Sequence, residues 1–265
     1  MAIEVFSRYE KKYLIDTKTY EYIIDKINDY MIPDKYSKNG EFYNIANIYY
    51  DTPDDALIRA SIEKPVYKEK LRLRSYGVPE LDDKVFLEIK KKYKGLVNKR
   101  RTKLRLYEAY ALTIDSEKLE LKDYMNAQVL KEIEYFLQIY DLYPKVYLAY
   151  DRRAYFAIDD SDFRVTFDTN IRSRREDVGL ENGNHGELLI GNDVWLMEVK
   201  SSMAVPLWFT KILSDAKVYA TSFSKYGTEY KKHLIKKNNL KGDNLLCLPT
   251  FLRQQQVQQY LIHQS

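Results

Sequence analysis

Charged residues at alternate positions are the chemically informative feature of this sequence. In residues 85–92, Glu88, Lys90 and Lys92 alternate with apolar residues. Four other segments show the same alternation with these charged residues: Arg8, Glu10 and Lys12; Lys70, Arg72 and Arg74; Arg164 and Asp168; Glu198 and Lys200. Because successive side chains of a strand point to opposite faces, each segment predicts a strand with one charged face.

These residue types suit the binding of a phosphate chain. Arginine binds phosphate oxygens through two parallel hydrogen bonds, and lysine acts as a mobile point charge. A carboxylate such as Glu198 among bases suits Mg²⁺ or Mn²⁺, which usually takes one or two carboxylates together with phosphate oxygens. Phosphoryl transfer needs little beyond positioning and charge stabilisation, so the set could support that reaction.

Two arrangements of the strands would explain the charged faces. Each face could be the solvated side of a sheet, as is common for one strand alone. The faces concentrate Arg and Lys, however, whereas a solvated face normally mixes in Ser, Thr, Asn and Gln. We therefore favour an α+β fold with a closed barrel of about eight strands whose charges point inward. Outward residues such as Leu71, Leu73, Val85 and Leu87 would then pack beneath helices.

Periodicity along the chain supplies the elements of such a barrel. Strands are predicted at 3–15, 42–51, 67–76, 85–93, 96–106, 144–156, 163–171 and 193–200. Helices are predicted at 16–30, 56–63, within 113–140, and at 206–219. We expect residues 1–235 to form one domain and residues 236–265 a peripheral tail.

Composition excludes several other classes of protein. The chain has 265 residues and a net charge of only +4, too balanced to favour nucleic-acid binding. Its single cysteine, Cys247, allows no intrachain disulfide, and His185, His233 and His263 form no metal-binding motif. The N-terminus lacks the pattern of a signal peptide, and no apolar run approaches the roughly 18 residues of a membrane helix. We therefore expect a cytoplasmic protein that has no membrane segment of its own and binds no nucleic acid.

An ordered set of motifs gives the chain a family resemblance. The motifs are Glu10 to Tyr13, Tyr49 to Thr52, Lys70 to Gly77, Phe86 to Lys90, Tyr150 to Tyr155, Arg164 to Asp168, Met197 to Lys200 and Phe223 to Tyr226. In this order, residues 5 to 232 closely resemble the VTC domain, the polyphosphate polymerase domain of the triphosphate tunnel metalloenzyme (CYTH-like) superfamily. The resemblance implies an antiparallel β-barrel tunnel with flanking helices. It also implies transfer of the γ-phosphoryl group of ATP to a growing polyphosphate chain.

The resemblance assigns roles by position. The residues implied to bind phosphates are Lys12, Arg72, Arg74, Lys90, Arg152, Arg164 and Lys225. The same seven residues and Lys200 are implied to take part in catalysis, and Glu198 is implied to hold Mn²⁺ or Mg²⁺. Lys99 or Arg101 would add to phosphate binding, with the strand register there left open. Glu10, Glu88 and Asp168 would be supporting or metal-facing acids.

One departure from the wider superfamily bears on the reaction. Its hydrolases typically begin Glu-x-Glu-x-Lys, whereas this chain has Arg8 in place of the first acid, and this favours the polymerase branch. Two alternatives stay open: a triphosphatase or polyphosphatase in the same tunnel, and a polyphosphate- or inositol-phosphate-binding module without catalysis. The eukaryotic family members carry regulatory and membrane segments, so a membrane partner protein is possible for this chain.

Overall fold

The computed structural model describes residues 9–37, 40–94 and 96–240. The chain divides into two compact units, Met1–Glu229 and Tyr230–Ser265. The strands and helices discussed below lie in the first unit, together with the first residues of α6 (Lys225–Leu240). Within the described part of the chain, no helix is long and apolar enough to cross a membrane. Arg8 and most of the predicted C-terminal tail lie outside the described residues.

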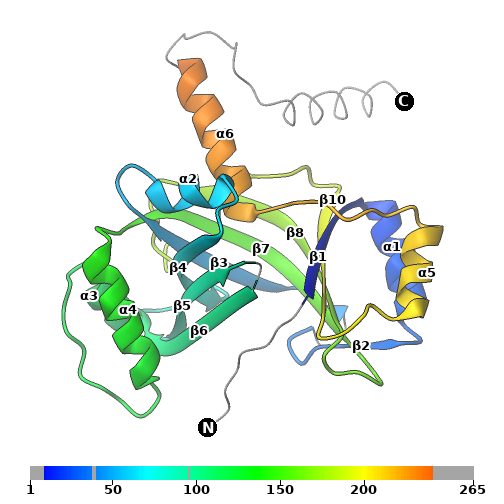
Figure 1. The fold of residues 1–265 in the computed structure, drawn as a ribbon, viewed down its shortest axis with the longest axis horizontal. Helices are drawn as coiled ribbons and strands as arrows, with labels where there is room; N and C mark the ends of the chain where they lie inside the picture. The colour runs from blue at the N-terminus through cyan, green and yellow to red at the C-terminus, as the bar shows by residue number, and fades with distance from the viewer. Residues whose placement is uncertain (1–8, 38–39, 95, 241–265) are drawn as a thin grey trace. The chain divides into compact units, whose positions relative to one another are not determined.

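One antiparallel sheet dominates the first unit (Figure 1). Hydrogen-bonded neighbours follow the order β1-β10-β8-β7-β3-β4-β5-β6. The bounds are β1 (Tyr9–Asp16), β10 (Val194–Ser201), β8 (Arg164–Arg174), β7 (Tyr143–Ala157), β3 (Tyr43–Asp51), β4 (Tyr67–Tyr76), β5 (Lys84–Tyr93) and β6 (Leu96–Arg105). Short strands β2 (Met31–Pro33) and β9 (Glu187–Leu188) pair with β7 and β8. The eight-strand path agrees with the predicted α+β fold.

The prediction of a closed barrel is wrong in one respect, because no hydrogen-bonded ladder joins β1 to β6 among the described residues. β6 carries Lys99, Arg101 and Lys103 along its length, and charged edge strands resist pairing. The sheet nevertheless curls strongly. In a flat sheet, β1 and β5 would lie about 29 Å apart, six strand spacings of roughly 4.8 Å. Instead, the charges of Glu10 and Lys12 act on Lys90, so the two ends of the path approach one another.

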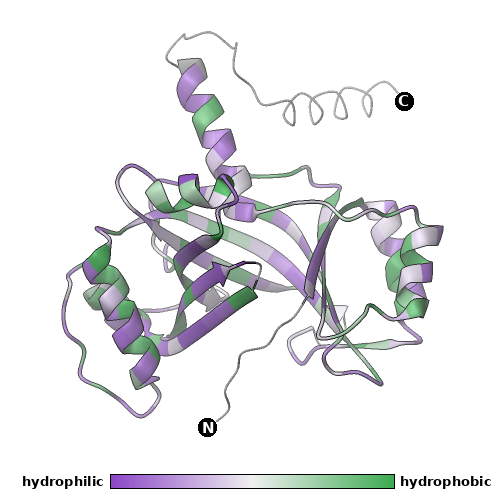
Figure 2. Cartoon of the chain, in the orientation of Figure 1, coloured by the Kyte–Doolittle hydropathy of each residue, from purple (hydrophilic) through white to green (hydrophobic). Residues whose placement is uncertain are grey.

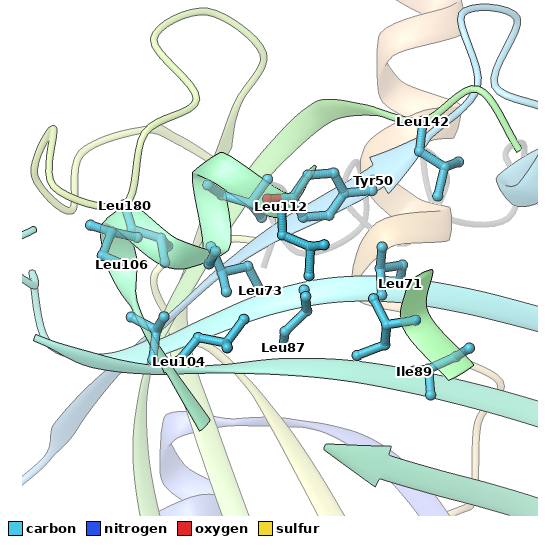
Figure 3. Packing of buried hydrophobic residues seen from close by; sticks show 14 of the residues in the cluster. Tyr50, Leu71, Leu73, Leu87, Ile89, Leu104, Leu106, Leu112, Leu142 and Leu180 are labelled. Carbon is cyan, nitrogen blue, oxygen red and sulfur yellow. The ribbon is translucent and has the colours of Figure 1, made fainter. Parts of the chain in front are cut away.

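Two apolar clusters cover the outer face of the curled sheet. The first joins β3, β4, β5 and β6 to α3 (Leu106–Thr113) and α4 (Ala127–Ile139). Figure 3 shows part of it, with Tyr50, Leu73 and Leu87 of the strands near Leu112 of α3. The second joins β1, β8 and β10 to α1 (Thr17–Ile27) and α5 (Leu207–Asp215). Leu71, Leu73, Val85 and Leu87 are all fully buried in the first cluster. Their predicted place beneath helices is therefore confirmed.

Local sequence explains how the covering helices begin. Asp16 accepts a hydrogen bond from the backbone N–H of Thr19 and caps α1, whose Tyr20, Ile23 and Ile27 face the second cluster. Asn126 caps α4 in the same way through Val129. The two faces of these helices differ in hydropathy, and Figure 2 shows hydrophobic and hydrophilic residues alternating along them. Apolar packing therefore belongs to the outside of the sheet, which leaves the inner face for polar groups.

Candidate functional site

The inner face of the sheet, meaning the side away from the two apolar clusters, carries nearly all the predicted site residues. Strand registers place their side chains on this face through pairs such as Lys12 with Glu198, Arg72 with Glu88, and Arg152 with Asp168. The inner face includes Glu10, Lys12, Asn47, Tyr49, Lys70, Arg72, Arg74, Glu88, Lys90, Lys99, Arg101, Arg152, Arg164, Thr166, Asp168, Glu198 and Lys200. Basic groups on this face outnumber carboxylates.

Glu198 is the centre of the first group of charges. Its carboxylate lies 3.3 Å from Lys12, 3.3 Å from Lys225, 3.5 Å from Arg152 and 3.7 Å from Lys200. Burial raises the pKa of Glu198, but these four positive charges outweigh burial and lower the pKa well below its usual range. Glu198 is therefore ionised, and it holds together bases from four separate elements.

Asp168 binds two of the same bases, Arg152 and Lys225. It is fully buried and accepts two hydrogen bonds from Arg152, at 2.6 and 2.8 Å, and one from Lys225 at 2.5 Å. Burial raises the pKa of Asp168, while Arg152 and Lys225 lower it by a larger amount. These contacts are shorter than those of Glu198, none of which is below 3.3 Å, so the contacts of Asp168 suit orienting Arg152 and Lys225 better than facing a metal.

Glu88 is the centre of a second group of charges, made by β4, β5 and β6. Its carboxylate, 1% exposed, lies 2.6 Å from Arg72, 2.7 Å from Lys99 and 3.8 Å from Arg74. Burial raises the pKa of Glu88, but Arg72, Arg74 and Lys99 lower it far below the usual range. Glu88 thus fixes three bases in position as an ionised carboxylate.

Two lysines between these groups form no ion pair among the described residues. Among the described residues, no carboxylate lies within ion-pair distance of Lys70 or Lys90, which stand opposite each other on β4 and β5. Burial and neighbouring positive charges lower the pKa of Lys70 to about 7. Burial lowers the pKa of Lys90 to about 8; the charge of Glu10 opposes this shift, and the charges of Arg72, Lys12 and Lys200 add to it. Cations held together in this way would be stabilised by an anion.

The start of α6 places Lys225 in the site. The N–H of Thr221 donates to the carbonyl of Lys12, which ties the preceding segment to β1. The Ser224 hydroxyl accepts from the N–H of Gly227 and caps the first turn. Tyr226 then donates to Asp51 at 2.9 Å. These contacts fix the helix start so that Lys225 is 8% exposed and reaches both Asp168 and Glu198.

The register of residues 99–101, open at the level of sequence, is settled by β6. Lys99 and Arg101 stand opposite Lys90 and Glu88 on the inner face. The guanidinium of Arg101 lies 4.6 Å from the centre of the Phe86 ring. Arg100 points the other way and pairs with Glu132 of α4.

The site offers oxygen ligands for a divalent cation, but the described residues do not form a complete set of protein ligands. No group of three or more His, Cys, Asp or Glu residues suited to a metal occurs in the described part of the chain. Lys12 and Lys200 each lie within 3.7 Å of both Glu10 and Glu198, so these two carboxylates are close neighbours. The buried Thr166 hydroxyl, opposite Glu198 in the ladder, has no hydrogen-bond partner. This donor set fits Mg²⁺ or Mn²⁺ held by one or two carboxylates and substrate oxygens.

Sequence reasoning missed several residues that complete the site. Lys70 was visible in the alternation of β4 but was not among the predicted phosphate ligands. Buried Asn47 accepts from Arg74 at 3.0 Å, and Arg74 also lies 3.5 Å from the Tyr150 hydroxyl. Asp34 pairs with Arg164 from the loop after β2, a contact without a signal in the sequence. The alternation on β3 and β7 could have indicated Asn47 and Tyr150.

Comparison with known proteins decides the family. The profile of the VTC domain matches residues 7–234. This chain belongs to the VTC domain family. Vacuolar transporter chaperone complex subunit 4 of Schizosaccharomyces pombe is 27% identical over 172 residues, which cover 57% of this chain and 24% of that protein. The Trypanosoma brucei brucei protein of the same name is 27% identical over 213 residues, covering 67% of this chain and 27% of that one.

These relatives are much longer than this VTC domain. The chain spans about a quarter of the length of these two curated relatives. Among solved structures, a Hippeastrum protein described as a candidate adenylyl cyclase with a dominant triphosphatase activity aligns with a TM-score of 0.51 and 14% identity. That alignment covers 84% of this chain and 95% of the Hippeastrum chain. At this identity the likeness bears on the fold alone.

Proposed function

We propose that this VTC domain is a metal-dependent polyphosphate polymerase, which transfers the γ-phosphoryl group of ATP to a polyphosphate chain. The observation that carries the proposal is the convergence of bases from seven strands and α6 on one inner face, where Lys70 and Lys90 have no carboxylate within ion-pair distance among the described residues. Such a face favours a ligand with closely spaced negative charges. A cytoplasmic location and a membrane partner protein are part of the same proposal.

The residues on the inner face suit transfer to phosphate better than transfer to water. Its carboxylates Glu88, Asp168 and Glu198 each pair with two or more bases and have lowered pKa values, which makes them poor proton acceptors. The terminal phosphate of a polyphosphate chain is already anionic and needs no general base. Its oxygen would attack the γ-phosphorus as the β–γ bridging P–O bond breaks, so that ADP leaves with that electron pair.

Each part of the site has a task in this reaction. Lys70, Arg72 and Lys90 would bind the chain and the triphosphate, and Arg152, Lys200 and Lys225 would stabilise charge at the reacting phosphates. Glu198, with Glu10 beside it, would hold Mn²⁺ or Mg²⁺. A divalent ion bound there neutralises charge on phosphate oxygens. Asp168 and Glu88 keep Arg152 and Arg72 in fixed orientations.

One experiment separates this proposal from its alternatives. The purified chain is incubated with ATP labelled in the γ-phosphate and Mn²⁺, and the products are resolved on a gel. We expect a ladder of labelled chains together with ADP. Free phosphate without chains would identify a triphosphatase, while tight binding of tripolyphosphate without turnover would identify a binding module. Either of these results would overturn the polymerase proposal.

A further inference from the structure

The inner face changes character along its length. At one end, the side chains of Tyr36, Tyr43, Tyr76 and Phe86 form a cluster that we call the aromatic end. The ring of Tyr76 lies 5.6 Å from Tyr36 in a nearly parallel arrangement, 6.3 Å from Tyr43, and 5.9 Å from Phe86 edge to face. Tyr36 is 53% exposed and Tyr76 is 42% exposed, so these two rings are available to a ligand.

The aromatic end is continuous with the phosphate-binding bases. Phe86 stands opposite Arg74 in the ladder, and Arg101 lies over the Phe86 ring. On the other side, Asp34 accepts hydrogen bonds from the Tyr43 hydroxyl and from Arg164, and from the backbone N–H of Tyr36. A ligand stacked on Tyr36 or Tyr76 would therefore have Arg74, Arg101 and Arg164 close to it.

The opposite end of the same face contains lysines. Lys68 stands opposite Lys92, and Lys70 stands opposite Lys90, an arrangement we call the lysine end. Along β4 the inward positions run Tyr76, Arg74, Arg72, Lys70, at steps of about 6.8 Å and over roughly 20 Å in total. That length accommodates an extended nucleoside triphosphate, with a flat apolar group at one end and the terminal phosphate toward the other.

We infer that the aromatic end is the nucleobase-binding site. ATP would then lie along the inner face with its base on the aromatic end and its γ-phosphate directed toward the lysine end. The inference rests on the proposed function, because it takes the nucleotide to be the phosphoryl donor. Base–aromatic stacking is sequence-tolerant because every base has a π-face. We therefore expect ATP and GTP to bind with similar affinity.

Paired affinities for ATP and tripolyphosphate test the inference, because the two ligands share the phosphates and differ in the nucleoside. Both affinities are measured by calorimetry on the full chain without metal, for the wild type and for Tyr36→Ala and Tyr76→Ala. We expect each substitution to weaken ATP binding by roughly tenfold. Tripolyphosphate binding should change less than twofold. Tyr135→Ala, at a 62% exposed position on α4, is the matched control and should change neither affinity.

Other outcomes overturn the inference. If both substitutions weaken ATP and tripolyphosphate equally, the aromatic end merely supports the phosphate site. If neither substitution affects either ligand, the base makes no contact there. These binding results do not depend on turnover. A chain that makes no polyphosphate but shows the ATP-specific loss would overturn the polymerase proposal and leave the base site in place.

Discussion

Four positive side chains converge on the carboxylate of Glu198. A substitution of this single residue should therefore change both the stability of the fold and the proposed reaction. Lys12, Arg152, Lys200 and Lys225 come from different elements and share the ionised Glu198 as a partner. Removing one partner of a buried ion pair leaves charges uncompensated and is usually destabilising. A polyanion could replace the missing negative charge, so binding and catalysis should respond differently to substitution here.

Glu198→Gln should separate anion binding from turnover. We expect polyphosphate synthesis to fall at least a hundredfold, because the proposed metal ligand is lost. Tripolyphosphate affinity without metal should be unchanged or tighter, because the inner face becomes more positive. The free energy of unfolding should drop by about 1–3 kcal/mol and recover on adding tripolyphosphate. Gel assays, calorimetry and chemical denaturation measure the three quantities, and wild-type turnover would refute the metal role.

The unpaired lysines should make anion binding depend on pH. Below pH 7, Lys70 and Lys90 are already protonated in the free protein, since their pKa values are lowered only to about 7 and 8. Above these values the free lysines are neutral, so binding must draw in protons, and affinity falls as pH rises. We expect at least tenfold weaker tripolyphosphate binding at pH 9 than at pH 6.5.

The control for this dependence is Lys70→Arg, because arginine keeps its charge over the whole range. Calorimetry in two buffers of different ionisation enthalpy counts the protons taken up on binding. Near pH 8, the variant should take up fewer protons than the wild type. Equal uptake by the two proteins would show that Lys70 does not titrate on binding, and the protons would then come from other groups or the ligand.

At the scale of elements, β6 offers a matched pair of neighbours. Arg101 faces the inner face near Phe86, while Arg100 faces outward and pairs with Glu132 of α4. We expect Arg101→Ala to weaken tripolyphosphate binding by roughly tenfold, about the effect of one hydrogen bond to a charged group. Arg100→Ala should change binding less than twofold, though it removes an ion pair that joins β6 to α4. Comparable losses from both variants would mean that β6 contributes only through its general charge.

The sequence predicted the strands more accurately than the helices. β4 lies at the predicted residues, and β3, β5 and β6 begin and end within one residue of prediction, because alternation of charged and apolar residues is a strong local signal. α4 (Ala127–Ile139) lies within residues 113–140, where a helix was expected, whereas α3 (Leu106–Thr113) was not predicted. α3 follows β6 directly, and its start is fixed by Glu108 accepting from the N–H of Arg105, a contact that periodicity does not show.

The same distinction applies to the candidate site. Residues on strands, such as Arg72, Lys90 and Glu198, were placed on the inner face by their two-residue period alone. Asp34 and Tyr36 come from a loop and reach the site through tertiary contacts that no local pattern shows. The lack of a hydrogen-bonded ladder between β1 and β6 in the described part of the chain was also unpredicted, because strand number alone does not determine whether a curled sheet closes.

For the molecule as a whole, polarity is inverted relative to an ordinary sheet domain. Apolar residues pack outside the sheet against α1, α3, α4 and α5, while the curled inner face gathers bases. Such an inner face opposes folding when it holds no anion, since like charges lie opposite one another at Lys70 and Lys90. Net charge would not reveal this, because +4 for the chain averages the basic inner face with acidic surfaces elsewhere.

Polyanion binding should therefore stabilise the fold more than salt does. At about 100 times its Kd, tripolyphosphate should add about 2.7 kcal/mol to the free energy of unfolding. For a domain of this size, that corresponds to a rise in Tm of roughly 5–10 °C. Sodium chloride at the same ionic strength screens the inner charges only in part, so a smaller shift is expected. In Lys70→Met/Lys90→Met, the unliganded protein should be more stable by about 1 kcal/mol, because the repulsion between these lysines is gone. The same variant should gain less from tripolyphosphate. Equal shifts with chloride and tripolyphosphate in thermal scans of the wild type would show that the bases do not act together on one anion.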